Sequence, residues 1–309
     1  MSEPTIGVIG LGKMGLQMSR NFLEAGEDVV GFDVDADSRS RFADLGGEPR
    51  DAPVAVARDV DLFITSLPTP QVVETVLTDD GTYEAAEEGT IHLEMSTIDP
   101  GTMIRIGEAA KESGVRPLGA PVSGGPENCY DGSLTIMVGG AEETYRDPIT
   151  QAALDQLGRK VYHTGGIDAG HTVKLINNAI SMSNLLIAFE SLSLGVARDV
   201  DPAILLEVIN NAGGGSNQFA KRVPRVLNRN FEPGFTIDFG RKDLGLALET
   251  ADQMDQPMFL TNLVHDMFTV ASNSGFGEED AGAIARLYEE YRNVHIEADE
   301  PVDESFAGY

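Results

Sequence analysis

The amino-acid sequence predicts an α/β fold, in which a doubly wound, mostly parallel sheet is followed by an all-helical domain. In the first half of the chain, short β-branched runs alternate with helical stretches, which is typical of parallel strands covered by helices. After Gly165 the pattern changes to long helical segments with no clear strand. We therefore expect one domain at residues 1–165 and a second at residues 166–309.

The expected strands of the first domain are short apolar runs. The four clearest end in turn signals and lie at residues 5–10, 27–33, 61–68 and 89–96. Three shorter strands are expected at residues 116–121, 134–140 and 160–165, so the sheet should end near residue 165.

The second domain should be built around one long helix at residues 171–198, which carries apolar residues on nearly every face. Its length would be roughly 42 Å at 1.5 Å per residue. A helix of this kind must be buried, here against the first domain or against a second subunit. Further helices are expected at residues 202–212, 217–228, 238–254, 257–275 and 278–295, followed by a loose acidic tail at 298–309.

The charge balance is strongly acidic, with 50 acidic residues against 22 basic ones and a net charge of −28. Such a surface repels nucleic acids and anionic membranes, so neither is expected as a partner. It also repels itself, and concentrated salt screens that repulsion to about 3 Å at 1 M. The composition therefore favours a halophilic protein.

The sequence also bears on location and metal binding. The N-terminus leads into the first expected strand without a leader, and the apolar stretch at 175–189 contains three asparagines and two serines, a poor composition for a membrane span. We expect a cytoplasmic protein. Cys129 is the only cysteine, which excludes an internal disulfide, and no cysteine–histidine cluster has metal-ligand spacing.

A glycine-rich motif, GLGKMG, follows the first expected strand and precedes a helical stretch. Its glycines allow a tight turn, close approach of a pyrophosphate and close packing of helix on strand, while the helix N-terminus offers free N–H groups. This context predicts a Rossmann-type dinucleotide-binding domain. The expected cofactor-binding residues of this loop are Gly10, Leu11, Gly12, Lys13, Met14 and Gly15.

An acidic residue, Asp33, ends the second expected strand. A carboxylate at this place can accept a hydrogen bond from the adenosine ribose 2′-hydroxyl and repels a 2′-phosphate. NAD is therefore expected in preference to NADP. Arg39 and Arg41 lie nearby in the sequence and weaken this preference, because an arginine can accommodate the phosphate.

Several motifs together resemble one enzyme family. They lie at residues 10–26, 95–101 (MSTIDPG), 119–140 (beginning GAPVSGGP), 170–178 (GHTVKLINN) and 241–249 (RKDLGLALE). With these motifs the sequence resembles the β-hydroxyacid dehydrogenases, the group that contains 3-hydroxyisobutyrate dehydrogenase and tartronate semialdehyde and glyoxylate reductases. The resemblance implies a Rossmann domain joined by a long helix to an all-α domain.

The resemblance also implies roles for individual residues. Ser123, Gly124 and Gly125 match the segment that holds the substrate carboxylate. A hydroxyl and backbone N–H groups without bulk suit an anion. The cofactor's nicotinamide side should be lined by Leu67, Pro68 and Thr97, and Lys242 should close over the cofactor with Phe235 and Asp243 nearby.

The catalytic lysine of the family matches Lys174, which stands in an otherwise uncharged apolar run. Oxidation of a 3-hydroxy acid sends a hydride from C3 to the nicotinamide while a base removes the hydroxyl proton. A lysine base needs a pKa lowered from about 10.4 towards neutrality, which partial burial favours. Asn178 lies one helical turn later on the same face and can hold the substrate oxygen or the lysine.

Other interpretations of these residues remain open at the level of sequence. His171 could be the acid–base group or a packing residue, and Ser123 could be a nucleophile, although no neighbour supplies a base. The remaining histidines are scattered and receive no role. Residues that could shape the substrate pocket are Met182, Asn217, Phe235 and Phe239.

Other functions are weighed beside a 3-hydroxyisobutyrate dehydrogenase. One is a reductase of tartronate semialdehyde, glyoxylate or succinic semialdehyde. A 6-phosphogluconate dehydrogenase should carry a histidine directly before the helix asparagine, where this chain has KLINN, and imine reductases usually replace the lysine. A non-catalytic dinucleotide sensor would not need Lys174. The substrate, the direction of reaction and the oligomeric state stay open, with a homodimer or homotetramer expected.

Overall fold

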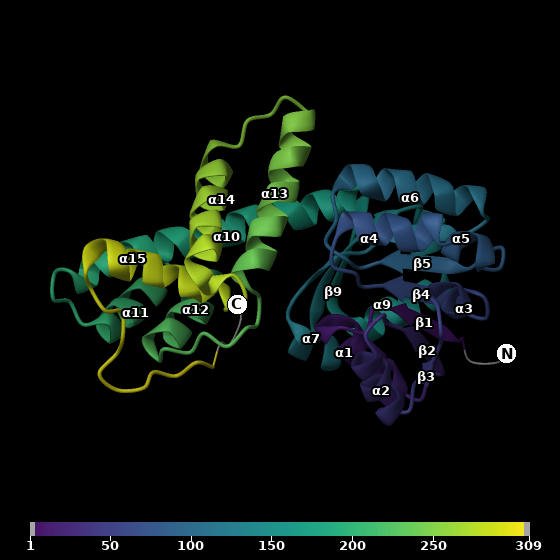
Figure 1. Cartoon of the computed structure of the whole chain (residues 1–309), viewed down its shortest axis with the longest axis horizontal. Coiled ribbons are helices and arrows are strands. Elements are labelled where there is room, and N and C mark those ends of the chain that lie inside the picture. Colours follow the sequence, from purple (N-terminus) through teal and green to yellow (C-terminus); the bar gives the residue numbers. More distant parts are fainter. Residues whose placement is uncertain (1–3, 306–309) are drawn as a thin grey trace. The chain divides into compact units, whose positions relative to one another are not determined.

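The computed structural model describes residues 4–305. It divides into two compact units, one up to Lys174 and one from Leu175, and the division falls inside helix α10 (Ala169–Val196). The sheet lies in unit 1, and unit 2 contains helices, as the sequence predicts (Figure 1).

Unit 1 is a nine-stranded sheet whose main path has the order β3-β2-β1-β4-β5-β6-β8-β7, with β9 paired to β8. Strands β1 to β6 pair in parallel, and β8 pairs antiparallel with β6 and β7. Figure 1 shows β5, β4, β1, β2 and β3 in this succession. The strands are β1 (Ile6–Ile9), β2 (Val29–Phe32), β3 (Glu48–Pro49), β4 (Leu62–Thr65), β5 (Ile91–Glu94), β6 (Arg116–Gly119), β7 (Val122–Ser123), β8 (Leu134–Gly140) and β9 (Gly158–Gly165).

Helices cover both faces of this sheet, because alternate residues of the central strands enter different apolar clusters. Leu62 and Ile64 of β4 pack with Phe22 in one cluster, and Phe63 packs with Val73 in another. The helices are α1 (Lys13–Glu24), α2 (Ala36–Asp44), α3 (Pro53–Ala57), α4 (Pro70–Glu74), η1 (Thr75–Asp79), α5 (Thr82–Ala85), α6 (Pro100–Glu112), α7 (Pro126–Tyr130), α8 (Glu142–Tyr145) and α9 (Pro148–Leu157).

Unit 2 is helical, and its core gathers around α10. Leu185 and Phe189 of α10 are fully buried with Val223 and Phe268, and α13 and α14 form a helical hairpin beside them (Figure 1). A buried ion pair joins Arg222 to Asp280. The remaining elements are α11 (Pro202–Asn210), α12 (Asn217–Leu227), α13 (Ile237–Gln253), α14 (Phe259–Ala271), η2 (Ser272–Phe276), η3 (Ala281–Ile284) and α15 (Ala285–Arg292).

The expected strands and helices are found, and the last strand ends at Gly165 as predicted. The two-residue strands β3 and β7 were not expected, because pairs this short carry no alternation. The expectation that the tail is loose is wrong for residues 302–304, which hydrogen-bond to Asn228. The Val302 N–H donates to Asn228 Oδ1 at 2.9 Å, and Asn228 Nδ2 donates to Glu304 at 2.9 Å. Residues 306–309 of the expected tail lie outside the described residues.

Within this single chain, helix α10 leaves one face exposed, a face that the sequence-based expectation would place against a second subunit. Four large apolar side chains on it are more than half exposed, namely Ile176, Ile180, Ile187 and Leu194. We call these four residues the α10 stripe. Within residues 4–305, α10 is also the one helix that has the length and apolar composition of a membrane span. Because its opposite side forms the core of unit 2, we interpret it as a core helix.

Candidate active site

The glycine loop after β1 fits its predicted role. Gly10 has a φ of +95°, and a Cβ there would lie 2.3 Å from the Ser66 carbonyl oxygen. A Cβ on Gly15 would lie 1.9 Å from the Gly10 carbonyl oxygen. Gly12 differs, because a Cβ there would meet no atom within 4 Å. Gly12 is also the N-cap residue of α1 and has no side chain that could hydrogen-bond to the first N–H groups of the helix. The helix N-terminus therefore faces open space that fits a pyrophosphate.

Two other loop residues contribute to packing. The Leu11 side chain is fully buried in the core of unit 1, and the Met14 sulfur lies 3.8 Å from the Cys129 sulfur. Burial raises the pKa of the Cys129 thiol to about 12, so this cysteine is an inert packing residue at neutral pH.

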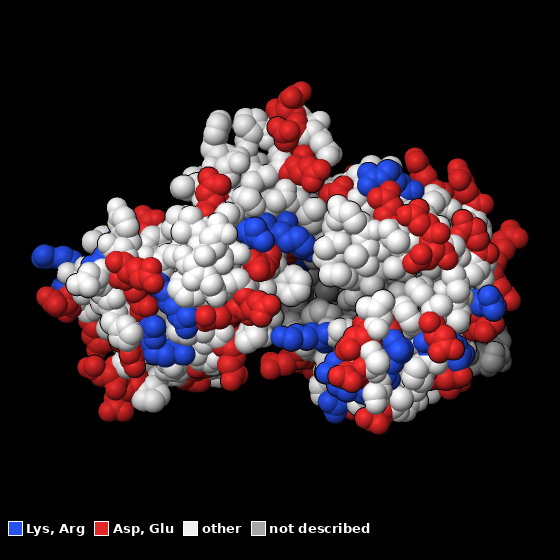
Figure 2. Space-filling view, viewed as in Figure 1, with Lys and Arg blue, Asp and Glu red and all other residues white. Residues whose placement is uncertain are grey.

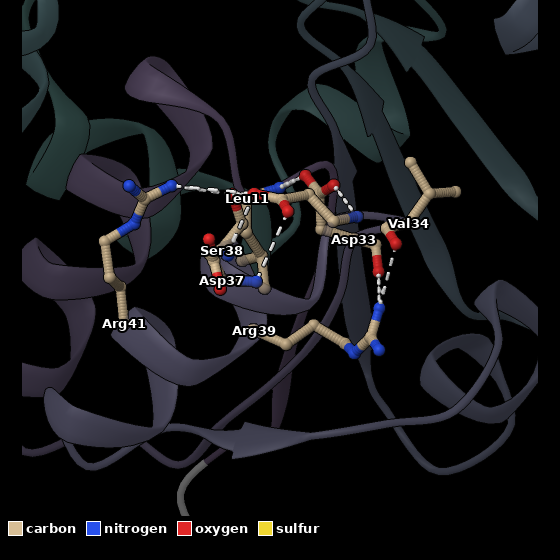
Figure 3. A network of polar contacts seen from close by, with 8 residues as sticks. Leu11, Asp33, Val34, Asp37, Ser38, Arg39 and Arg41 are labelled. Atoms are coloured by element: carbon tan, nitrogen blue, oxygen red, sulfur yellow. Dashed lines mark hydrogen bonds and ion pairs between the residues drawn. The ribbon is translucent and has the colours of Figure 1, made fainter.

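Asp33 is fixed by the backbone around it (Figure 3). Its Oδ2 accepts the Leu11 N–H at 2.7 Å, and its Oδ1 accepts the Asp35 N–H at 2.9 Å. The carboxylate therefore joins the glycine loop to the end of β2. Each oxygen has a second lone pair, so a ribose hydroxyl can still donate to it. The sequence indicated the acidic residue but not its bond to the Leu11 N–H.

The two neighbouring arginines have partners within the same turn (Figure 3). Arg39 Nη1 donates to the carbonyl oxygens of Asp33 and Val34 at 2.5 and 3.2 Å. Arg41 donates to the Ser38 hydroxyl at 2.8 Å. Arg39 therefore holds the backbone at the residue that would meet the ribose.

The segments after β4 and β5 are joined by one hydrogen bond. The Leu67 N–H donates to the Ser96 hydroxyl oxygen at 2.8 Å. Pro68 and Thr97 follow these two residues, so the three predicted nicotinamide residues lie at the carboxyl ends of neighbouring parallel strands. Strand β4 also pairs with β1, where the strand order reverses, and ligands bind at such a reversal in open α/β sheets.

The expected carboxylate-binding loop lies between β7 and α7. Gly124 has a φ of +135°, and a Cβ there would lie 2.8 Å from Leu134 Cδ2, so this position requires glycine. The Gly125 N–H donates to Asn128 Oδ1 at 2.9 Å. The expectation that Gly125 offers a free N–H to an anion is therefore corrected, because the side chain of Asn128 already accepts it.

Lys174 and Asn178 occupy successive turns of α10, and both are largely buried, at 9% and 5% exposure. Asn178 Nδ2 donates to Asp243 Oδ2 at 2.6 Å, and its Oδ1 accepts from Asn177 at 3.1 Å. The Asn178 amide is thereby held in one orientation.

Asp243 lies next to Lys242, as expected, and also contacts Asn178. It is 2% exposed on α13, and its other oxygen lies 3.0 Å from Lys242 Nζ. Asp243 therefore links the two residues, Lys242 and Asn178, that the sequence assigned separately to cofactor and substrate. Phe235, predicted nearby, packs against the core of unit 2, with its ring 6.3 Å from that of Phe239.

His171 is fully buried against Gly119, where a Cβ would lie 2.8 Å from its ring. Burial lowers the pKa of His171 to about 3, so its ring is neutral. This environment supports the packing role over the acid–base role.

Comparisons with known proteins agree with this arrangement. A family model described as the NAD binding domain of 6-phosphogluconate dehydrogenase matches residues 5–165. A second, described as NAD-binding of NADP-dependent 3-hydroxyisobutyrate dehydrogenase, matches residues 168–288.

Individual relatives cover nearly the whole chain. L-threonate dehydrogenase of Cupriavidus necator is 35% identical and covers 92% of this chain and 95% of its own. 2-(Hydroxymethyl)glutarate dehydrogenase of Eubacterium barkeri is 33% identical, and the match covers 94% of this chain and 97% of that protein. The structure of Mycobacterium tuberculosis 3-hydroxyisobutyrate dehydrogenase with L-serine has a TM-score of 0.85 at 29% identity, covering 93% of this chain and 99% of that one.

The glycine loop, the sheet topology and these matches define an NAD(P)-dependent dehydrogenase. The buried lysine and asparagine on one helix accompany this cofactor domain. The chain belongs to the β-hydroxyacid dehydrogenase family, whose members include 3-hydroxyisobutyrate dehydrogenase.

Proposed function

We propose that this enzyme transfers a hydride between NAD and C3 of a small 3-hydroxy acid, with Lys174 as the group that takes up and returns the proton. The observation that supports this most is a buried lysine one turn before an asparagine whose amide is held by Asp243. A protein that only binds dinucleotide has no physical need for this arrangement.

The residues of this chain then have distinct tasks. The bound nicotinamide supplies the hydride acceptor. Lys174 accepts the hydroxyl proton during oxidation and returns it during reduction, and Asn178 donates to the same substrate oxygen or holds Lys174. The Ser123 hydroxyl and the Gly124 N–H bind the substrate carboxylate, since the Gly125 N–H is already used. Thr97, Leu67 and Pro68 flank the nicotinamide.

The substrate is tested by a rate screen that follows NADH absorbance in molar KCl. The alcohols are 3-hydroxyisobutyrate, 2-(hydroxymethyl)glutarate, L-threonate, glycerate, serine and 6-phosphogluconate. The aldehydes are tartronate semialdehyde, succinic semialdehyde and glyoxylate. We expect a 3-hydroxy acid or its semialdehyde to give the highest kcat/KM. Turnover confined to glyoxylate or succinic semialdehyde, which are reduced to a 2-hydroxy acid and a 4-hydroxy acid, would contradict the proposal.

We propose that the enzyme prefers NAD because of Asp33. Its partly buried carboxylate can accept a hydrogen bond from the ribose 2′-hydroxyl of NAD and repels the 2′-phosphate of NADP. Replacing Asp33 with Ala should lower the ratio of kcat/KM for NAD to that for NADP by about tenfold or more, the loss of one charge-assisted hydrogen bond. Loss of the bond to the Leu11 N–H weakens both cofactors alike, so the ratio isolates the 2′ position. Asp44→Ala, at the far end of α2, is the charge-matched control. An unchanged ratio would exclude the ribose contact.

The α10 stripe supports association with a second copy of this chain. Its residues recur after four, seven and seven positions and so share one helix face, which would otherwise expose isoleucine and leucine to water. Two copies that each carry a charge of −28 repel one another, and Figure 2 shows acidic side chains spread over the visible face. We therefore propose a halophilic homodimer or homotetramer.

Light scattering and thermal unfolding in KCl test the two parts of this proposal. The distance over which charges repel falls from about 10 Å at 0.1 M salt to about 3 Å at 1 M salt. The higher salt should therefore weaken the repulsion between acidic residues, raise the melting temperature and favour the oligomer. Ile180→Glu should remain monomeric in high salt, whereas Met254→Glu, outside the stripe, should associate normally. Wild-type protein that stays monomeric at every salt concentration would overturn the stripe's role, and a melting temperature indifferent to salt would overturn the halophilic one.

We also propose that the enzyme acts in the cytoplasm, with no nucleic acid or membrane as partner, because its acidic charge repels both. Recovery of the activity in the membrane fraction after cell lysis would contradict this.

A further inference from the structure

Glu94, at the end of β5, is a fully buried carboxyl with no role in the chemistry described above. Its Oε1 accepts the Ser96 N–H at 2.7 Å, and its Oε2 accepts the Thr65 hydroxyl at 2.6 Å. The Ser96 side chain also hydrogen-bonds to it. Because the Ser96 oxygen accepts the Leu67 N–H, one carboxyl lies behind both segments that flank the nicotinamide.

The hydrogen bonds continue away from the site into the core. His92 Nε2 lies 2.8 Å from the Thr65 hydroxyl, and His92 Nδ1 lies 2.8 Å from the Tyr83 hydroxyl. With Glu94 ionised, the hydrogen bonds of this network all run towards it: Tyr83 donates to His92, His92 donates to Thr65, and Thr65 donates to Glu94. With Glu94 protonated, its O–H donates to Thr65, and the remaining bonds reverse by a change of His92 tautomer.

In the described part of the structure, the side chains that hydrogen-bond to Glu94 or continue its hydrogen-bond network are neutral. They are the neutral side chains of Thr65 on β4, His92 on β5, Tyr83 on α5 and Ser96, with His171 on α10 facing His92. Asp99, at the start of α6, faces His171. Burial raises the pKa of Glu94 to about 7 and lowers that of His92 to about 3. The buried charge is therefore costly, and a neutral core would be more stable.

We propose that Glu94 is a positioning residue of the dehydrogenase: its carboxylate holds Ser96, and through Ser96 it holds the backbone at Leu67, so that the two strand-end segments fit the nicotinamide. This inference rests on the proposed function for its catalytic consequence and on the geometry alone for its binding consequence. A charged acceptor holds the Ser96 N–H and hydroxyl more tightly than a neutral one does.

Glu94→Gln tests this, because glutamine keeps the shape and fits the reversed hydrogen-bond chain. Its oxygen accepts the Ser96 N–H, and its amide donates to Thr65. The variant should bind NADH about tenfold more weakly and bind ADP-ribose as well as wild type, since ADP-ribose has no nicotinamide. Both affinities can be measured without turnover, the first by NADH fluorescence and the second by competition. These two binding measurements therefore do not depend on which substrate the enzyme uses.

Stability should change in the opposite direction. The folded-state pKa of Glu94 is raised, so protonation stabilises the fold below about pH 7 and that contribution is lost as the pH rises through about 7. Above this pH, Glu94→Gln should melt no lower than wild type although it binds NADH less well. A purely structural role predicts that affinity and melting temperature fall together.

Ser96→Ala completes the test as a double-mutant cycle. If Glu94 acts through Ser96, the double variant should bind NADH less weakly than the sum of the two single effects predicts, because Ser96→Ala removes the hydroxyl link to Leu67 but keeps the backbone N–H. The NADH affinity of the wild type should weaken as the pH drops through about 7, and Glu94→Gln should lack this inflection. The proposal is overturned if Glu94→Gln leaves NADH affinity unchanged, weakens ADP-ribose equally, or adds its full effect to that of Ser96→Ala.

Discussion

Lys174→Met is expected to lower kcat by about 100- to 10,000-fold, the range contributed by a positioned acid–base group. Methionine matches the length of the lysine stem and removes only the amine. Because the side chain is 9% exposed on α10, its apolar stem should keep its packing, and the melting temperature should stay close to that of wild type. NADH affinity should remain unchanged, since the proposed role is proton transfer to the substrate.

The matched control is Lys111→Met, which removes the same charge from the exposed last turn of α6. It should have wild-type kcat. Asn178→Ala should also lower kcat, because it removes the amide held by Asp243. If Lys174→Met turned over normally with normal cofactor binding, the proton transfer would have to be assigned to another group.

Gly12→Ala and Gly15→Ala should fail in different ways, although both lie in the glycine loop. At Gly12 a Cβ meets no protein atom within 4 Å, and its φ of −67° suits alanine. The folded protein should tolerate this methyl group, with a melting temperature near that of wild type. The methyl group would however occupy the space predicted for the pyrophosphate, so NADH affinity should fall by about tenfold or more, or about 1.4 kcal/mol.

At Gly15 the same methyl group would lie 1.9 Å from the Gly10 carbonyl oxygen. The loop and α1 must separate to admit it, which should destabilise the fold by about 1–3 kcal/mol or more. Thermal unfolding and NADH titration of the two variants distinguish these effects. A destabilised Gly12→Ala variant that still binds NADH tightly would contradict the assignment of the open space to the cofactor.

The sequence predicted those parts of the fold and site that depend on neighbouring residues. GLGKMG between a strand and a helix predicted the loop, and Asp33 could be recognised because it ends the next strand. The spacing of Lys174 and Asn178 placed both on one helix face. These features follow from backbone periodicity and turn chemistry, which a single sequence shows directly.

The remaining features depend on contacts between residues far apart in the chain. Leu67 and Ser96 are 29 residues apart, and Asn178 and Asp243 are 65 apart, so their hydrogen bonds follow only from strand and helix packing. The burial of Glu94 could not be inferred either, because an acidic residue at the end of a strand is normally exposed. The exposed face of α10 could not be predicted for a similar reason. The helix is apolar on nearly every face, and only the packing shows which face contacts the core of unit 2.

Deuterium transfer tests the central claim most directly. The enzyme is incubated with NAD and 3-hydroxyisobutyrate in which both C3 hydrogens are replaced by deuterium, or with the best 3-hydroxy acid from the rate screen fully deuterated at C3, and the reduced cofactor is examined by mass spectrometry. Hydride transfer from C3 predicts one deuterium in the nicotinamide ring with wild-type enzyme and almost none with Lys174→Met. Reduced cofactor that forms without deuterium would show that the hydride leaves another carbon and would contradict a 3-hydroxy acid dehydrogenase.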